Sequence, residues 1–381
     1  MASTVYFTSL RTGFGNSLLT KIQRLARAAG LEAIVRKKGL TAVKIHFGER
    51  GNTGFIRPLL VRPVVDAVLE AGGRPFLTDS GTLYPGSRSN AVDHLNTAIL
   101  NGFAYPVIGA PLIIADGIDG HDEAAVPVNL KHFKKVLIGS AIVRADSLVS
   151  LAHFKLHEAS GFGGAIKNIG MGTASRKGKM AQHSEVAPEV ISKKCIGCGF
   201  CIEQCAQDAI SLVDRPPDIP APSASVTKIM RIDQELCAGC ARCIHVCPQG
   251  ALTINWEKDL PKFMEKMVEY TAGALKGKEK RSLFINFLTQ ISPACDCYPF
   301  ADAPIVGDIG ITASTDPVAI DQACVDLVNS QPLLESSRLK GIEKPCADKI
   351  RAVYPHIGWE RQLIYASEIG IGSREYELVE I

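Results

Sequence analysis

The sequence predicts an α/β protein whose body is a largely parallel sheet with helices on both faces, interrupted by a small inserted α+β module. Short β-rich runs alternate with helix-like stretches, a pattern typical of parallel sheets. Eight of the twelve cysteines fall within residues 195–247, and the alternation continues on both sides of them. At about 150 residues per domain, 381 residues suffice for two to three domains. We therefore expect a first part of the body at 1–188, the module at 189–256 and the rest of the body at 257–381.

The elements of the body follow from hydrophobic periodicity. The first of the helix-like stretches, residues 17–29, places Leu18, Ile22, Leu25 and Ala29 on one stripe. Before the module, strands are predicted at 5–10, 42–47, 75–78, 112–115, 135–138 and 148–152, and further helices at 60–71 and 91–101. After the module, a helix is predicted at 260–275 and strands at 283–288 and 308–313. Asp316 and Pro317 then begin another helix, as N-cap and first residue.

Composition and charge exclude several classes of protein. Hydrophobic residues make up 46% and charged residues 21%, which excludes a disordered chain. The 42 basic and 39 acidic residues leave a net charge of +3, too weak a field to indicate nucleic acid or an anionic membrane as partner. The apolar runs are too short to span a bilayer and the N-terminus lacks a signal-peptide pattern, so we expect a cytoplasmic protein. Disulfides are disfavoured there, and clustered cysteines more often bind metal or do redox chemistry.

The cysteines of the module form two runs of the same pattern, C-x2-C-x2-C-x3-C, 42 positions apart. This is the spacing of bacterial two-cluster ferredoxins, in which the fourth cysteine of each run binds the other cluster. We therefore expect two [4Fe–4S] clusters. One set of ligands is Cys195, Cys198, Cys201 and Cys247, and the other is Cys237, Cys240, Cys243 and Cys205.

Zinc is the alternative cofactor for these cysteines. Structural zinc sites usually use two C-x2-C pairs separated by a longer loop, rather than four cysteines within eleven residues. The chain departs from the ferredoxin pattern at one position, because Ala206 follows Cys205 where the pattern has proline, as at Pro248. This change removes no ligand.

Several segments resemble the family known as domain of unknown function 362, in its form with a ferredoxin insert. They are KIHFGERGNTGFIRP, FLTDSGTLYPGSR, HFKLHEASGFGGAIKN, the double cysteine motif, ACDCYPFADAPIVGDIG and STDPVAIDQACVDL. The resemblance spans nearly the whole chain. It implies a cluster-bearing α/β protein of the ferredoxin-type oxidoreductase class, but no settled reaction.

Three of the predicted strands end in polar residues, at the place where open parallel sheets bind their ligands. A glycine-rich stretch at 161–164 then leads into a helix with Lys167 and Asn168, and its backbone N–H groups are expected to bind an anion. Together these residues predict a cationic pocket for a carboxylate or phosphate, with a histidine that donates a proton near neutral pH. The alternative is that they are structural or surface polar residues. The candidates at the strand ends are Lys44, His46, Asp79, His153, Lys155 and His157; the last three share a face if their strand continues through residue 157.

Cys295 and Cys297 are the other candidate pair. Two thiols two residues apart can bind a metal, hold a further cluster or act as a redox pair. They can also be two small buried hydrophobic residues. Asp308 is expected nearby, and Cys324, on an apolar helical stripe, is expected in the core.

The function that these patterns favour is that of a cytoplasmic reductase. A redox donor protein or another low-potential donor reduces the two clusters, which pass electrons to a small anionic substrate or a metal in the body. In this hypothesis a lysine (Lys44, Lys155 or Lys167) holds the anionic group, and His46 or His157 supplies protons. No flavin motif is evident, although a bound flavin stays open. The rival hypotheses are a pure electron carrier with a docking body and a metal- or cluster-handling protein that uses Cys295 and Cys297.

Overall fold

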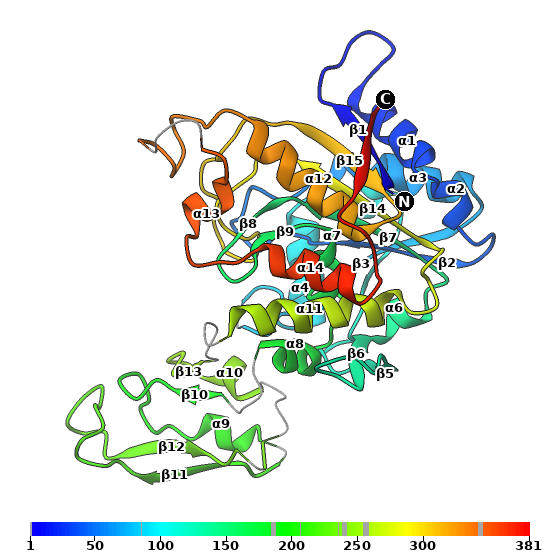
Figure 1. Ribbon diagram of the computed structural model, residues 1–381. Coiled ribbons are helices and arrows are strands. Elements are labelled where there is room, and N and C mark those ends of the chain that lie inside the picture. Colours follow the sequence, from blue (N-terminus) through cyan, green and yellow to red (C-terminus); the bar gives the residue numbers. More distant parts are fainter. Residues whose placement is uncertain are drawn as a thin grey trace.

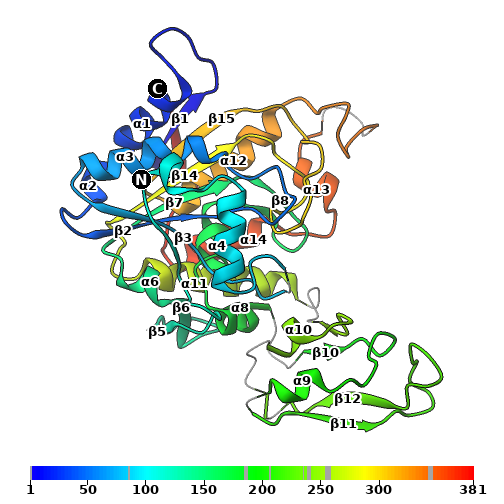
Figure 2. The same ribbon diagram turned by 180° about the vertical axis from the view of Figure 1, so that it is seen from behind.

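The computed structural model describes residues 2–84, 86–183, 188–205, 207–234, 236–237, 242–253, 259–341 and 346–381. They form a large α/β body and a small module that projects from it, which Figures 1 and 2 show from opposite sides. The predicted fold class is confirmed, because a mostly parallel sheet lies between two layers of helices.

An eight-stranded sheet forms the centre of the body, in the order β16-β1-β15-β14-β7-β2-β3-β4. Neighbouring strands run parallel, except that β15 lies antiparallel between β1 and β14. The carboxyl ends of β14, β7, β2 and β3 therefore lie along one edge. The strands are β1 (Ser3–Ser9), β2 (Leu40–Ile45), β3 (Arg74–Asp79), β4 (Leu112–Ile114), β7 (Ser147–His153), β14 (Ser282–Leu288), β15 (Gly310–Ser314) and β16 (Tyr376–Glu380).

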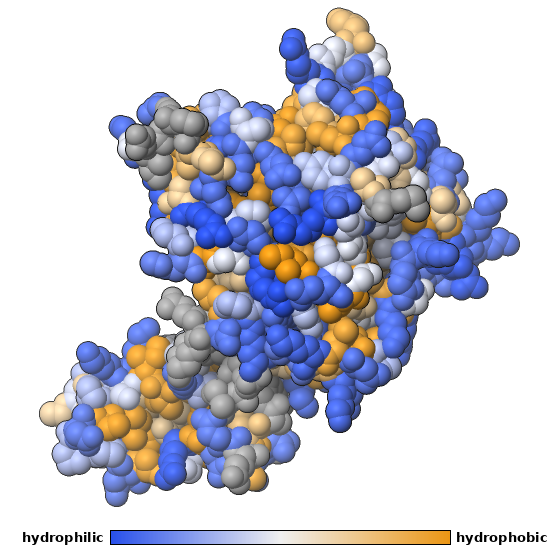
Figure 3. Space-filling view, in the orientation of Figure 1, coloured by the Kyte–Doolittle hydropathy of each residue, from blue (hydrophilic) through white to orange (hydrophobic). Residues whose placement is uncertain are grey.

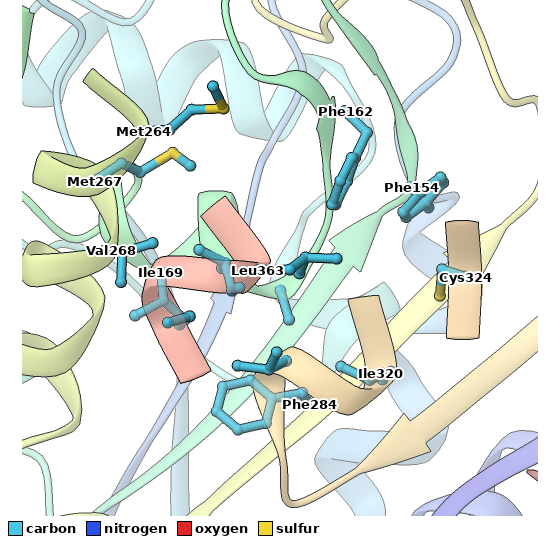
Figure 4. Close-up of a cluster of buried hydrophobic side chains, with 14 of the residues drawn as sticks. Phe154, Phe162, Ile169, Met264, Met267, Val268, Phe284, Ile320, Cys324 and Leu363 are labelled. Carbon is cyan, nitrogen blue, oxygen red and sulfur yellow. The ribbon is translucent and has the colours of Figure 1, made fainter. Parts of the chain in front are cut away.

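Each face of the sheet packs against its own helices, because alternate strand residues point to opposite faces. On β7, Leu148 belongs to one core and Val149 to the other. The helices with residues in the first core, part of which Figure 4 shows, are α6 (Ser140–Arg144), α7 (Ala165–Gly170), α11 (Leu260–Leu275), α12 (Pro317–Ser330), α13 (Lys349–Val353) and α14 (Glu360–Glu368). The helices of the second are α1 (Leu18–Ala28), α2 (Leu31–Ile34), α3 (Arg62–Glu70), α4 (Ala91–Leu100) and α5 (Tyr105–Ile108), and the 3₁₀ turn Pro58–Leu60 precedes α3.

Two expectations about strands need correction. The strand predicted at 135–138 forms as β6 (Lys135–Gly139), but it pairs with β5 (Glu123–Pro127) in a hairpin outside the main sheet. The strand through Leu148 does not continue to residue 157. β7 ends at His153, and a separate strand β8 (Lys155–His157) pairs antiparallel with β9 (Gly161–Gly163).

The predicted start of α12 is confirmed. The side chain of Asp316 accepts hydrogen bonds from the backbone N–H groups of Val318 (2.8 Å) and Ala319 (2.9 Å), and Pro317 is the first helical residue. Both features satisfy or remove N–H groups that a helix start leaves without partners. The helix places Cys324, which is fully buried, in the core as predicted (Figure 4).

The module consists of two similar halves. β10 (Glu189–Val190) pairs with β13 (Leu252–Thr253), and β11 (Ile210–Asp214) pairs with β12 (Lys228–Ile232), both antiparallel. One short helix follows β10 and the other follows β12, in the order β-α-β-β-α-β. The helices α9 (Phe200–Glu203) and α10 (Arg242–Val246) begin 42 residues apart, so the repeat of the sequence is also a repeat of the structure. The module is connected to the body through α8 (Arg176–His183) on one side and α11 on the other.

Among the described residues, no helix has both the length and the apolar character that crossing a bilayer requires.

Candidate functional site at the sheet edge

Lys44 and Asp79 form a buried ion pair where β2 and β3 end side by side. Lys44 Nζ lies 3.0 Å from Asp79 Oδ1, and both side chains are at most 3% exposed. Burial lowers the pKa of Lys44, and Asp79 opposes that effect. Burial alone raises the pKa of Asp79, but Lys44, His94 and His46 together outweigh it and hold that pKa well below the usual value. Lys44 also donates to Asn168 Oδ1 (2.9 Å), which joins β2 to α7.

Arg88 extends this pair into a network that the sequence did not single out. Its guanidinium lies 3.3 Å from Asp79 Oδ2 and 3.2 Å from Glu49 Oε2, and it donates to the hydroxyl of Tyr84 at 2.5 Å. Glu49 and Arg88 fall within two of the segments that carry the family resemblance, KIHFGERGNTGFIRP and FLTDSGTLYPGSR. Buried charges of this kind are tolerated because each is paired and hydrogen-bonded.

His46 directly follows the last residue of β2, and its side chain is a neutral hydrogen-bond donor. Its Nδ1 accepts from the backbone N–H of Gly48 at 3.0 Å, so the ring proton is on Nε2. Burial and then Arg88 lower its pKa well below the usual value. Among the described residues none accepts a hydrogen bond from Nε2, and the side chain is half-buried.

The carboxylate of Asp296 contacts both a histidine and a lysine at the end of β7. His153 Nδ1 lies 2.9 Å from its Oδ1, and Lys155 Nζ lies 3.3 Å from its Oδ2. Burial raises the pKa of Asp296, but His153 and Lys155 outweigh it and hold the pKa well below the usual range. His153 and Lys155 are thus brought together as predicted, by a shared carboxylate rather than by one continuous strand.

The residue pair Cys295 and Cys297 lies on either side of Asp296. The thiol of Cys297 hydrogen-bonds to Cys295, and this bond, followed by Lys167, lowers the pKa of Cys295 well below that of an ordinary thiol. The same bond raises the pKa of Cys297. Lys167 Nζ lies 3.5 Å from Cys295 Sγ. The carboxylate of Asp308 accepts from the backbone N–H of Gln290 (2.6 Å), and none of the contacts described for the two cysteines involves it.

His157 is held within its own turn. Its Nδ1 accepts from the N–H groups of Ala159 (3.1 Å) and Ser160 (3.2 Å). Burial, and then Lys167, lower its pKa well below the usual value. His46 and His157 are therefore both uncharged at neutral pH, which differs from the expectation that one of them is an acid near neutral pH.

The predicted anion site at the glycine-rich stretch is wrong. The first N–H groups of α7, those of Ala165 and Ile166, donate to the carboxylate of Asp321 on α12 at 2.7 and 3.0 Å. A Cβ on Gly164 would lie 2.2 Å from Asp321 Oδ1, so glycine is required for this close approach. The start of a helix binds an anion through its free N–H groups, and at α7 these groups already bind the carboxylate of Asp321.

The expected cationic pocket also differs in the structure, because each of its three lysines is paired with a negatively charged group. Lys44 pairs with Asp79, Lys155 with Asp296 and Lys167 with the thiolate of Cys295. Lys155 and Lys167 nevertheless lie close together, because a Cβ on Gly163 would lie 3.6 Å from Lys155 Cε and 3.0 Å from Lys167 Cδ. Each has one hydrogen-bond or ion-pair partner among the described residues, and an ammonium has three donors.

In the module, four cysteines line one pocket. They are the first predicted ligand set: Cys195, Cys198, Cys201 and Cys247. Each thiolate of a [4Fe–4S] cluster binds a different iron, so the ligands surround the cluster rather than meet at one point. The donor set fits such a cluster, and the presence of the cluster stays a prediction. The described residues contain no group of three or more His, Cys, Asp or Glu side chains that could hold a single metal ion.

The second ligand set is only partly described. Cys205, Cys237 and Cys243 are among the described residues, and Cys240 lies outside them. Cys243 and Cys205 belong to the hydrophobic core of the module or pack against it. This second site also stays a prediction.

The hydrophobic core of the module includes residues of the body. Leu83, from the loop between Asp79 and Arg88, and Met180, on α8, belong to the same cluster as Cys195 and Cys201. Both are at most 3% exposed. Met180 follows Lys179, another buried lysine, whose pKa burial lowers to about 8. Two body residues from segments next to the sheet edge are therefore packed into the hydrophobic core that includes Cys195 and Cys201.

The family model "Domain of unknown function (DUF362)" matches residues 41–326, which include nearly all of β2, the module and most of α12. The chain belongs to this family. No curated protein sequence matches the chain. The DUF362 region holds every candidate residue described above.

A solved structure also resembles the chain. The lactate racemase apoprotein from Thermoanaerobacterium thermosaccharolyticum is similar at 16% identity, over 62% of this chain and 56% of that one, with a TM-score of 0.32. The chain thus spans little more than half the length of that protein. A likeness at this level carries no argument about function.

Proposed function

We propose that this DUF362 protein is an iron–sulfur oxidoreductase that passes electrons through two [4Fe–4S] clusters to an anionic substrate at the carboxyl edge of the body sheet. Cys195, Cys198, Cys201 and Cys247 hold one cluster. The other is held by Cys205, Cys237, Cys240 and Cys243. When bound, the clusters supply single-electron transfer, and the protein positions the substrate and tunes the electrostatics.

The continuous packing between module and body carries this proposal. Leu83 and Met180 belong to the hydrophobic core of the module, together with Cys195 and Cys201, and lie in the segments that hold Asp79, Arg88 and Lys179. An independent electron carrier on a flexible tether needs no such shared core. The packing therefore favours electron delivery into the body over a body that only docks partners.

The substrate is proposed to bind where hydrogen-bond donors remain unused. Lys155 and Lys167 lie side by side across Gly163, each with donors left for a ligand. His46 follows β2 at the same edge of the sheet, and its Nε2–H has no acceptor among the described residues. A carboxylate or phosphate oxygen is the group that such donors bind best.

The electron donor is proposed to dock on the module. Cys198 is exposed, and its neighbours Ile196 and Phe200 are 40% and 51% exposed. Figure 3 shows hydrophobic patches on the visible face of the module, set among hydrophilic residues. An apolar surface at an exposed cluster ligand suits a transient redox partner.

Cluster content is the first test. Anaerobically reconstituted protein should hold about eight iron atoms and eight acid-labile sulfides per chain. The variant Cys198→Ala should lose iron and sulfide, whereas Cys346→Ser, at a cysteine outside both motifs, should not. Zinc without labile sulfide would end the proposal.

Substrate binding is the second test. Small molecules released from the purified holoprotein by denaturation are identified by mass spectrometry, and the clusters, once reduced, are mixed with each. We expect an anionic compound that reoxidises the clusters, and slower reoxidation in Lys155→Met. Lys37→Met, at an exposed lysine before β2, is the matched control. Equal reoxidation rates in all three proteins would favour the pure electron carrier.

A further inference from the structure

We propose that Cys295 and Cys297 form a redox-active pair that cycles between a dithiol and an intrachain disulfide beside Lys167. The two cysteines occupy the first and third positions of a turn that is closed by the hydrogen bond from Tyr298 N to Cys295 O (3.1 Å). Their side chains are hydrogen-bonded to one another. The two thiols are therefore neighbours in the folded protein, and a disulfide between them closes a short ring within this turn.

The turn is held by side chains and backbone from separate parts of the body. The carboxylate of Asp296 binds His153 and Lys155, and its backbone carbonyl accepts from the N–H of Glu49 at 3.1 Å. The hydroxyl of Tyr84 donates to the carbonyl of Cys297 (3.1 Å). Asn52 Nδ2 donates to the carbonyls of Tyr298 (3.1 Å) and Phe300 (2.8 Å). A turn supported by so many contacts keeps its backbone geometry when its cysteines are oxidised or reduced.

The chemistry of the two thiols differs, which a redox pair needs. Cys295 is the attacking group, because the Cys297 thiol and the Lys167 ammonium both stabilise its thiolate. Cys297 stays protonated and acts second. If the two cysteines were only buried hydrophobic residues, no difference between their thiols would be required.

The proposed substrate class is an oxidised thiol compound, a disulfide. The Cys295 thiolate attacks one sulfur of the substrate, forms a mixed disulfide and releases the other half as a thiolate. Cys297 then attacks Cys295 Sγ, its proton passes to the released thiolate, and the second half of the substrate leaves as a thiolate. The product on the chain is the Cys295–Cys297 disulfide, and the substrate has gained the two electrons.

Regeneration of the pair rests on the function proposed above. Two electrons, delivered singly through the two clusters, and one proton convert the disulfide into the Cys295 thiolate and the Cys297 thiol. The electrons come from the external low-potential donor. The pair thus converts single-electron delivery into two-electron chemistry at the sheet edge.

The first experiment tests the redox activity of the two cysteines without reducing the clusters. The holoprotein is equilibrated with glutathione buffers of increasing oxidation, and the peptide that carries both cysteines is analysed by mass spectrometry. We expect a mass lower by about 2 Da that dithiothreitol restores, with a single two-electron transition. In Cys297→Ser, glutathione should accumulate on Cys295, because no second thiol displaces it. Cys346→Ser should behave like the parent protein. A pair that stays reduced throughout, or a Cys297→Ser protein without the adduct, would overturn the inference.

A pH profile tests the role of Lys167. Alkylation of Cys295 should have its midpoint well below that of an ordinary thiol, near 8.5. Lys167→Met should move the midpoint to higher pH, and Lys37→Met should leave it in place. An unchanged midpoint in Lys167→Met would contradict the assignment.

A final experiment distinguishes the redox activity of the two cysteines from their proposed reduction through the clusters. Oxidised holoprotein is treated with reduced methyl viologen, and Cys198→Ala is the control for direct reduction of the disulfide. Reduction in the parent but not in the variant supports both proposals. If dithiothreitol reduces the pair but reduced clusters do not, the pair stands and the proposed electron route is wrong.

Discussion

Asp296 shows how much of the site depends on a single carboxylate. It is fully buried, balances Lys155, orients His153 and forms the centre of the turn that carries the two thiols. A buried charge is tolerated only with its partners, and removing one partner leaves the other uncompensated. The same physics applies to Asp79 between Lys44 and Arg88.

We expect Asp296→Asn to lower the free energy of unfolding by about 3 kcal/mol, because Lys155 then remains buried without its counter-charge. Urea unfolding of the reconstituted protein measures this. Asp302→Asn, at an exposed position in the same loop, should change the value by less than about 0.5 kcal/mol. Equal stabilities of the two variants would contradict the role of Asp296.

At the scale of elements, α7 depends on a helix that follows it by about 150 residues in the chain. Asp321 on α12 receives the first two N–H groups of α7 and the amide of Asn286 on β14 (2.7 Å). This contact replaces the local N-cap that α7 lacks. Lys167 and Asn168, both on α7, are thereby positioned by α12.

Asp321→Ala should therefore cost about 3 kcal/mol, because it leaves buried N–H donors without an acceptor. Hydrogen exchange should become faster in α7 before the rest of the sheet. Loss of protection that is uniform over the whole body would show that Asp321 does not support α7 in particular.

The contact between α11 and α14 predicts a pH dependence of stability. Glu265 on α11 binds Arg361 (2.6 Å), Lys131 (2.8 Å) and His132 (2.5 Å). Although burial opposes them, these partners lower the pKa of Glu265 from 4.5 to about 2. A carboxyl group with a lowered pKa in the folded state stabilises the fold above its unfolded pKa, and this contribution falls away as the pH drops toward 2.

We expect Glu265→Gln to be less stable than the parent by roughly 2 kcal/mol at pH 7, from weaker hydrogen bonds to three charged partners. The difference should shrink between pH 4.5 and pH 2. Thermal unfolding across this range measures it, and a difference that is constant with pH would contradict the assignment.

At the scale of the molecule, the module is joined to the body by more than its two connections. Leu83 and Met180 are buried with residues of the module, so removal of the module exposes them. The two cores of the body contain neither residue and are complete without the module. We therefore expect the body to fold without the module.

Deletion of residues 189–256, replaced by a short flexible linker, should leave a folded body of lower solubility. Changing Leu83 to Ser in the deletion protein should improve solubility, because it removes exposed apolar surface. Circular dichroism and thermal unfolding measure the fold. A deletion protein that is wholly unfolded would show that the module is integral to the core.

Local pattern determined the elements of this protein and the place of its site. Hydrophobic periodicity predicted α1, α11, α12 and the main parallel strands, and the cysteine spacing predicted the four residues that surround one cavity. Polar residues at the ends of β2, β3 and β7 marked the sheet edge, because parallel strands end together. Only the tertiary structure decided the partners: β15 running antiparallel, Asp321 at the start of α7, Arg88 beside Asp79 and Asp296 between its two cations. These pairings join residues far apart in the chain or on neighbouring loops. Periodicity reports which face a residue occupies, and it carries no information about which distant residue will meet it there.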